Sequence, residues 1–240
     1  MSERTGGITN DPIHRWQLWV WRAGHLLPGR PPETTRLDGL DEAARERLYD
    51  GGYQQVAALA ERIEAQTGRA LESCRVLDFG CGVGRNALPL AERCEYVYGL
   101  DVSPAVLREA DRTAKQRNLS NVEWMDAQRL SELSGRYDLV ISFFVFQHIP
   151  SREGERIFTT LVRGLRPGGV GAIQVTLRPG FRSLNRSYLY RLTNSYSLNR
   201  LGRLLAGEGI TEWHAKLHPR RGPATKRPSY DDVTIIFRKD

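Results

Sequence analysis

One stretch decides the fold of this chain: Val76-Leu77-Asp78-Phe79-Gly80-Cys81-Gly82-Val83-Gly84-Arg85. Its apolar first half predicts a buried strand, and its three alternating glycines predict a tight turn that opens a helix. Glycines in such a turn let backbone amides approach a ligand closely. Several nucleotide-binding folds share this kind of turn, so by itself it predicts the fold class and leaves the ligand open.

Strands and helices alternate on both sides of this turn. Strands are expected at 75–79, 96–100, 122–125, 137–142 and 170–176. Helices are expected at 86–93, from Pro104 after the cap residue Ser103, and from Ser151 to the Pro167-Gly168-Gly169 turn. This alternation predicts an α/β domain with a parallel sheet and right-handed crossovers.

The flanking segments are less regular. Before the alternating region, a long helix is expected over 40–67, with Gly51-Gly52 as an interruption and Gly68 as its C-cap. A tryptophan-rich stretch at 12–27 also fits a helical stripe. After the alternating region, the pattern predicts a helix at 198–206 and strands at 210–217 and 233–237.

Two acids sharpen the prediction of the ligand. Asp78 ends the first strand beside the glycine turn, where a carboxylate would repel a pyrophosphate but suits a cation. Asp101 ends the second strand, 19 residues after Gly82, where a carboxylate can accept hydrogen bonds from both ribose hydroxyls. Together they indicate a positively charged nucleoside without phosphates. Asp101 could instead merely cap the helix at Ser103.

With these residues in place, the chain resembles the class I S-adenosylmethionine-dependent methyltransferases. The resemblance covers roughly residues 70–176 and is carried by VLDFGCGVGR, YGLDVSP, the Asp126-Ala127 pair and LRPGGV, in that order. It implies a Rossmann-like sheet of seven strands, mostly parallel with the last strand antiparallel, and helices on both faces. Residues 1–70 would form an N-terminal helical extension or lid, and 71–240 the S-adenosylmethionine-binding domain, with 178–206 inserted on the acceptor side.

The resemblance also implies S-adenosylmethionine as the cofactor. The residues that would bind it are Asp78, Gly80, Cys81, Gly82, Asp101, Val102, Asp126, Ala127 and Phe143. Asp78 would orient the amino group of the methionine part, and Asp101 would hold the ribose. Asp126 would accept a hydrogen bond from the adenine amine, although it could also be an ordinary loop acid.

A catalytic base is harder to predict. His148 follows the fourth strand, at the edge of the sheet where ligands bind, and its ordinary pKa suits proton transfer near neutral pH. It is our candidate base for a hydroxyl acceptor, with support of its own loop as the alternative. The tryptophan-rich N-terminus and residues 178–200 are expected to form the acceptor lid, although the aromatic residues could instead form a helix core or a homodimer contact.

The function expected is methyl transfer to a small-molecule hydroxyl, on a saccharide or a secondary metabolite. The alternatives are an N-methyltransferase for a small amine, a nicotinamide oxidoreductase, and a binding module without catalysis. A nucleic-acid methyltransferase is a further alternative, because the net charge is +7 and the pI about 9.6. Against it, Ser142-Phe143-Phe144-Val145 replaces the Asn/Asp-Pro-Pro-Tyr/Phe motif of enzymes that methylate base amines.

Composition sets the remaining expectations. With 40% apolar residues in 240, the chain has enough material for a packed core. It has no apolar run long enough to span a bilayer and no apolar signal region at its start, so we expect a cytoplasmic protein. Three cysteines without metal-site spacing predict reduced packing residues and no metal centre.

Overall fold

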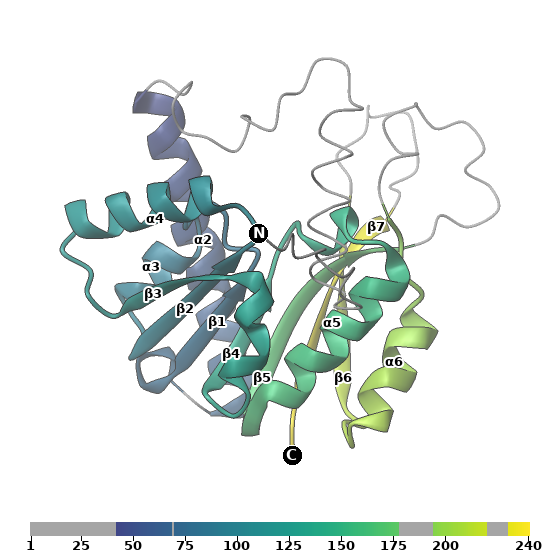
Figure 1. The fold of residues 1–240 in the computed structure, drawn as a ribbon. Helices are drawn as coiled ribbons and strands as arrows, with labels where there is room; N and C mark the ends of the chain where they lie inside the picture. The colour runs from purple at the N-terminus through teal and green to yellow at the C-terminus, as the bar shows by residue number, and fades with distance from the viewer. Residues whose placement is uncertain (1–41, 69, 178–193, 220–229) are drawn as a thin grey trace, which may run out of the picture.

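The computed structural model describes residues 42–68, 70–177, 194–219 and 230–240. Their centre is a seven-stranded sheet in the order β3-β2-β1-β4-β5-β7-β6 (Figure 1). The strands are β1 (Arg75–Phe79), β2 (Tyr96–Asp101), β3 (Val122–Asp126), β4 (Tyr137–Ser142), β5 (Leu165–Thr176), β6 (Trp213–Pro219) and β7 (Tyr230–Arg238). Strands β1 to β5 pair in parallel, whereas β7 pairs antiparallel with both β5 and β6, so the predicted fold class is confirmed.

Helices cover both faces of this sheet. They are α2 (Glu42–Thr67), α3 (Ala87–Ala91), α4 (Pro104–Gln116), α5 (Ser151–Gly164) and α6 (Leu198–Gly207). Side chains of β1 alternate between two buried clusters: Leu77 packs with the α5 and α6 face, and Val76 with α2 and α3. Figure 1 shows α5 and α6 together in front of the β4–β7 half of the sheet. The core is therefore two apolar layers separated by the strands.

The glycine pair in α2 does not interrupt the helix, contrary to expectation. Helix α2 is continuous from Glu42 to Thr67. A Cβ atom at Gly52 would lie 1.9 Å from the carbonyl oxygen of Arg85, at the end of the glycine turn. The glycine therefore serves close packing of α2 on that turn. The expected C-cap is confirmed, because Gly68 has φ +65° and donates its N–H to the carbonyl of Glu64 at 2.8 Å.

Several boundaries differ from those expected, among them the limits of α3 and β7, and at α5 and β6 the structure shows the cause. Helix α5 ends at Gly164, ahead of Pro167-Gly168-Gly169, because Leu165 is already extended and pairs with Tyr137 of β4. The Pro-Gly-Gly segment lies inside β5, where the register of the β4–β5 pair shifts. Strand β6 begins at Trp213, since Ile210 instead donates its N–H to Leu205 and closes the end of α6.

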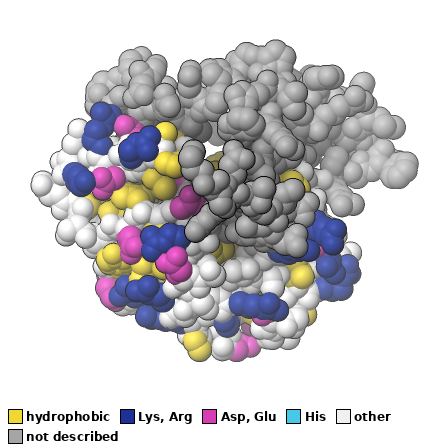
Figure 2. Space-filling view, in the orientation of Figure 1, with side chains coloured by type: hydrophobic (Ala, Val, Ile, Leu, Met, Phe, Trp, Pro, Cys, Tyr) yellow, Lys and Arg dark blue, Asp and Glu magenta, His cyan; other side chains and the backbone are white. Residues whose placement is uncertain are grey.

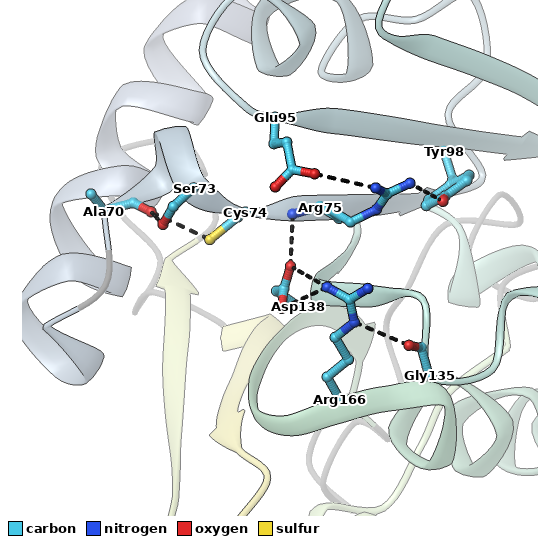
Figure 3. Close-up of polar contacts among 9 residues, drawn as sticks. All are labelled: Ala70, Ser73, Cys74, Arg75, Glu95, Tyr98, Gly135, Asp138 and Arg166. Carbon is cyan, nitrogen blue, oxygen red and sulfur yellow. Dashed lines mark hydrogen bonds and ion pairs between the residues drawn. The ribbon is translucent and has the colours of Figure 1, made fainter.

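The edge of the sheet where β1 and β4 begin carries a polar network (Figure 3). Asp138 is 3% exposed, and its carboxylate accepts the backbone N–H of Arg75 at 2.9 Å. Both of its oxygens also lie 3.4 Å from Nη1 of Arg166, whose Nε donates to the carbonyl of Gly135. Nη2 of Arg75 in turn donates to the hydroxyl of Tyr98 at 2.6 Å. The buried acid at this edge is thus paired by groups of the protein itself.

The remaining expectations concern the cysteines, membrane-spanning helices and the acceptor lid. Cys74, Cys81 and Cys94 are buried free thiols. None of the helices in the described ranges combines the length and apolar character needed to cross a bilayer. The tryptophan-rich stretch 12–27 and residues 178–193 of the expected acceptor lid lie outside the described residues.

Candidate cofactor and acceptor site

The glycine turn closes tightly on one side and stays open on the other. The N–H groups of Gly80 and Cys81 both donate to the carbonyl of Leu100, at 2.7 and 3.0 Å. Gly80 has φ +79°, and a Cβ atom there would lie 2.2 Å from Val145. Gly82 also has positive φ, but a Cβ atom there would meet no atom of the described residues within 4 Å. A ligand can therefore reach the backbone at Gly82.

Asp101 holds the turn and caps the next helix. One carboxylate oxygen accepts the N–H of Gly82 at 3.0 Å, and the other accepts the N–H of Ser103 at 2.9 Å. Ser103 occupies the expected N-cap position of α4, but its own side chain makes no capping bond. The capping alternative is thus part of the role of Asp101. The backbone N–H of Val102 also contributes a hydrogen bond to this carboxylate. Because a carboxylate has about four acceptor positions, these bonds leave room for a ribose hydroxyl.

Asp78 is the unsatisfied acid of the site. Its side chain is 2% exposed and lies beside the backbone N–H of Ala87, whereas Oδ2 has no hydrogen-bond partner among the described residues. Burial, with a smaller contribution from the charge of Asp101, raises the pKa of Asp78 to about 7. Burial likewise raises the pKa of Asp101 above its ordinary value. A bound cation would relieve both effects, because it favours the ionised carboxylates.

The expected adenine residues meet at the ends of β2 and β3. Asp101 and Asp126 are register partners on these two strands. Asp126 Oδ1 accepts the N–H of Gln128 at 2.8 Å and so caps the short helix η4 (Ala127–Leu133), in which Ala127 is fully buried. Val102 is half-buried and packs against the apolar core. The structure thus brings the expected nucleoside residues together, although their binding roles stay predictions.

A cavity of about 440 Å³ opens beside this site. It is lined by Gly51, Gln54, Gln55, Arg85, Phe143, Phe144, Gln174, His218 and Asp232. These residues come from α2, from the end of the glycine turn, and from the ends of β4, β5, β6 and β7. The cavity contains Phe143, which was predicted to bind the cofactor, but none of the acids expected to bind the nucleoside. It is therefore a candidate acceptor site adjoining the cofactor site.

Phe144, two residues after the end of β4, has an unusual backbone conformation. Its φ is +62°, and its side chain is 50% exposed in spite of its apolar character. A bulky residue in the left-handed region is strained, and such residues cluster at binding and catalytic sites. This backbone conformation places the ring of Phe144 in the wall of the cavity.

Polar residues of the last two strands form the far wall. His218 and Asp232 face each other across β6 and β7. Nε2 of His218 lies 2.8 Å from the hydroxyl of Thr234, and Asp232 accepts the hydroxyl of Thr176 at 2.7 Å. Burial, together with the nearby Lys216 charge, lowers the pKa of His218. Its ring is accordingly neutral at neutral pH and able to accept a proton.

His148, the base predicted from sequence, lies elsewhere. It ends the short helix η5 (Phe146–His148), has an exposed side chain, and has Nε2 3.2 Å from the amide nitrogen of Gln147. It is not among the residues that line the cavity. Its catalytic role stays a prediction. Sequence reasoning assigned no role to Arg85, His218 or Asp232, although Arg85 closes the motif that decided the fold.

No metal centre is evident in the part of the chain that the structure describes: it contains no group of three His, Cys, Asp or Glu side chains able to hold an ion. The thiol of Cys81 is buried against the two site acids, and burial raises its pKa well above the usual range. It is therefore uncharged and contributes to the turn by packing.

Comparison with solved structures places this architecture. The fold is similar to that of magnesium protoporphyrin IX methyltransferase from Synechocystis with S-adenosylhomocysteine bound. The TM-score is 0.62 at 22% identity, over 85% of this chain and 90% of the other. The same enzyme with S-adenosylmethionine bound gives a TM-score of 0.59 at 19% identity, over 98% of this chain and all of the other. The fold is that of the class I methyltransferases.

Sequence comparison identifies similar proteins. Residues 76–169 match the family model described as a methyltransferase domain. Magnesium-protoporphyrin O-methyltransferase of Synechocystis is 37% identical over 125 residues, 52% of this chain and 54% of that protein. Ubiquinone biosynthesis O-methyltransferase of Rhizobium etli is 32% identical over 108 residues, 45% and 43% of the two chains. Residues 76–169 are thus similar to a methyltransferase domain, and the chain spans about half the length of the curated relatives it matches.

Proposed function

We propose that this protein transfers the methyl group of S-adenosylmethionine to a hydroxyl oxygen of a small molecule, a saccharide or a secondary metabolite. The observation that carries the proposal is the buried carboxylate of Asp78, which has an unpaired oxygen beside an open glycine turn. Such a group is costly to bury unless a cation or a donor satisfies it. S-adenosylmethionine has an ammonium group and a sulfonium, and no phosphate.

The residues of this chain would act mainly by positioning. Asp78 would hold the amino group of the methionine part, directly or through water, and Asp101 would hold the ribose. S-adenosylmethionine, when bound, supplies a methyl group already activated on sulfur. The cavity beside Phe143 and Phe144 would align the acceptor oxygen with that methyl group and exclude water. The new O–CH₃ bond forms as the S–CH₃ bond breaks, and the hydroxyl proton passes to a base.

Two histidines are candidates for this base. His148 is the choice from sequence, and His218 is the one that lines the cavity. The base should lose turnover on substitution by alanine while S-adenosylhomocysteine affinity is retained, because it touches the acceptor and not the nucleoside. Full activity of one variant would remove that histidine as the base. The two variants are controls for each other, since each keeps the other ring.

The relatives support a small-molecule acceptor without fixing which one. Two of their names give unlike substrates, magnesium-protoporphyrin and trans-aconitate, a third gives only ubiquinone biosynthesis, and each protein matches over only part of its length. On the described part of the face shown in Figure 2, basic and acidic side chains are interspersed. That distribution gives no support there for a continuous nucleic-acid track.

The donor proposal is tested by calorimetric titration with S-adenosylhomocysteine and with NAD⁺. S-adenosylhomocysteine should bind and raise the melting temperature, while NAD⁺ at equal concentration should do neither. NAD⁺ carries a pyrophosphate, which the two acids would repel. Binding of NAD⁺ alone would refute the proposal. Transfer of labelled methyl from S-adenosylmethionine to a panel of hydroxylated acceptors then separates an enzyme from a binding module.

A further inference from the structure

We propose that Arg85 binds an anionic group of the acceptor, so that the substrate class is a planar hydroxylated carboxylic acid. The inference rests on the proposed methyl transfer and names the acceptor that the same site would take. Arg85 is the last residue of the glycine motif, and its side chain lines the cavity that adjoins the proposed nucleoside site.

The backbone of α2 fixes the position of this arginine. The carbonyl of Arg85 packs on Gly52, and Nη2 would lie 2.9 Å from a Cβ atom at Gly51. The consecutive glycines thus leave space on the helix for both the backbone and the guanidinium. Any side chain at Gly52 would displace Arg85, so the pair sets where the positive charge stands.

The guanidinium is left without a protein partner in the described ranges. Its Nε atom is buried and has no hydrogen-bond acceptor. Arg85 also makes no ion pair with any described residue. Other arginines of the described ranges, such as Arg163 with Glu208 and Arg166 with Asp138, are paired with carboxylates. A buried guanidinium N–H without an acceptor is costly, which indicates that a ligand supplies the acceptor.

The other lining residues select the kind of anion. Asp232 is the one acid of the described lining, and it already accepts the hydroxyl of Thr176. Gln54 and Gln55 are uncharged, and His218 has a lowered pKa. The lining therefore carries one formal negative charge, on Asp232, which is hydrogen-bonded to Thr176, and one formal positive charge, on Arg85, whose Nε has no acceptor in the described ranges. The planar fork of Arg85 matches a carboxylate with two parallel hydrogen bonds.

The aromatic wall favours a flat ligand. Phe143 and Phe144 both line the cavity, and the strained backbone of Phe144 presents a half-exposed ring. A ring of the ligand can stack on such a surface. Since none of the acids expected to hold the nucleoside lines this cavity, the anion is assigned to the acceptor and not to the methionine carboxylate.

The test compares 4-hydroxybenzoate with 4-hydroxybenzamide, two probes that differ in charge at one group. Binding is measured by ligand-observed NMR, with and without saturating S-adenosylhomocysteine. The wild-type protein should bind the acid about tenfold more tightly than the amide, as expected for a hydrogen-bonded ion pair. Arg85→Gln should abolish this preference, and Arg85→Lys, which keeps the charge, should keep part of it.

Two controls make the result specific. Arg156→Gln removes an exposed arginine of α5 and should leave the preference unchanged. S-adenosylhomocysteine affinity should be the same in the wild type and in Arg85→Gln. Melting temperatures of the Arg85 variants verify that both are folded, and Arg85→Lys provides a readout if the glutamine variant is not.

The outcomes separate this inference from the donor proposal. Equal binding of acid and amide by the wild type would overturn the role of Arg85, whether or not S-adenosylhomocysteine binds. A tenfold loss of S-adenosylhomocysteine affinity in Arg85→Gln, with the acid preference intact, would also overturn this role. It would indicate that Arg85 binds the methionine carboxylate of the cofactor. Failure of S-adenosylhomocysteine to bind the wild type would refute the donor proposal alone.

Discussion

Two buried aspartates at opposite ends of neighbouring strands have opposite surroundings. Asp138, near the start of β4, accepts the N–H of Arg75 and lies beside the guanidinium of Arg166 (Figure 3). Asp78, near the end of β1, keeps one oxygen unpaired, and burial raises its pKa to about 7. Their exposed fractions are nearly equal, 3% and 2%. Burial is therefore the same, and only the supply of partners differs.

The two edges of the sheet thus differ in hydrogen bonding: at one, the buried acid is paired within the protein, and at the other, polar groups lack a partner among the described residues. Where β1 and β4 begin, the protein supplies the groups that its buried acid needs. Where they end, it leaves a carboxylate, an open glycine and an unpartnered guanidinium. Ligands of open α/β sheets bind at the carboxyl ends of the strands, so the unsatisfied groups are where the fold predicts a site. Substitutions at the two edges should differ in whether stability or binding changes.

The largest effect is expected at the ligand edge, from Asp101→Ala. The variant should lose at least about 100-fold in S-adenosylhomocysteine affinity, because hydrogen bonds to a charged group contribute about 1.5–3 kcal/mol each. It also removes the acceptor that holds Gly82 and Ser103. Calorimetric titration measures the loss. Asp101→Asn, which keeps one acceptor oxygen, should lose less, and unchanged affinity in both variants would discard the ribose role.

At the opposite edge, Asp138→Ala should lower the free energy of unfolding by about 2–3 kcal/mol, since it leaves a buried N–H and an arginine without their carboxylate. Affinity for S-adenosylhomocysteine, measured where the variant is fully folded, should stay within about twofold of wild type. Urea denaturation measures the first quantity. The isosteric Asp138→Asn is the control and should cost less. A large loss of affinity would show that the two edges are coupled.

The sequence predicted the fold because its signals are local. Strand β1, the glycine turn and the start of α4 at Pro104 each follow from a few neighbouring residues, and the structure has them at or near the expected positions. The acids predicted to bind the nucleoside rest on the same kind of signal, because each ends a strand of a recognisable motif, and their binding roles stay predictions. Where the local signal misled, at Gly51-Gly52 and at Pro167-Gly168-Gly169, a packing contact or a strand register had priority.

The cavity was beyond such reasoning because its wall is assembled from distant segments. Gln54 of α2, His218 of β6 and Asp232 of β7 meet only because β7 inserts between β5 and β6. No spacing along the chain records that neighbourhood. Phe144 belongs to the segment after β4 that the sequence singled out. Its positive φ could not be predicted, because phenylalanine rarely adopts that backbone conformation.

The stability of the ligand edge should rise when its unpaired acid is neutralised. Asp78→Asn should increase the free energy of unfolding at pH 8 by about 2 kcal/mol, because the folded protein without ligand then no longer carries a buried, unpaired charge. The same variant should bind S-adenosylhomocysteine about tenfold more weakly. Urea denaturation and calorimetric titration measure the two. A variant both less stable and normal in binding would assign Asp78 to structure, as for Asp138.

The pH dependence is the most direct measure of the unpaired carboxylate, because it titrates that group without substitution. The folded protein raises the pKa of Asp78 from 3.8 to about 7, so between these values it binds a proton that the unfolded chain has lost. Stability without ligand should therefore fall as the pH rises from about 4 to about 7 and then level off.

Binding should show the opposite trend. S-adenosylhomocysteine carries an ammonium that pairs with the ionised acid, so its affinity should rise by up to tenfold per pH unit toward pH 7 and then become constant. Calorimetric titrations from pH 5.5 to 8.5 measure the profile, and the asparagine variant, which has no proton to lose, should flatten it. A profile that is flat in the wild type would mean that the carboxylate does not face the ligand, and the unpaired oxygen of Asp78 would then not mark a ligand site.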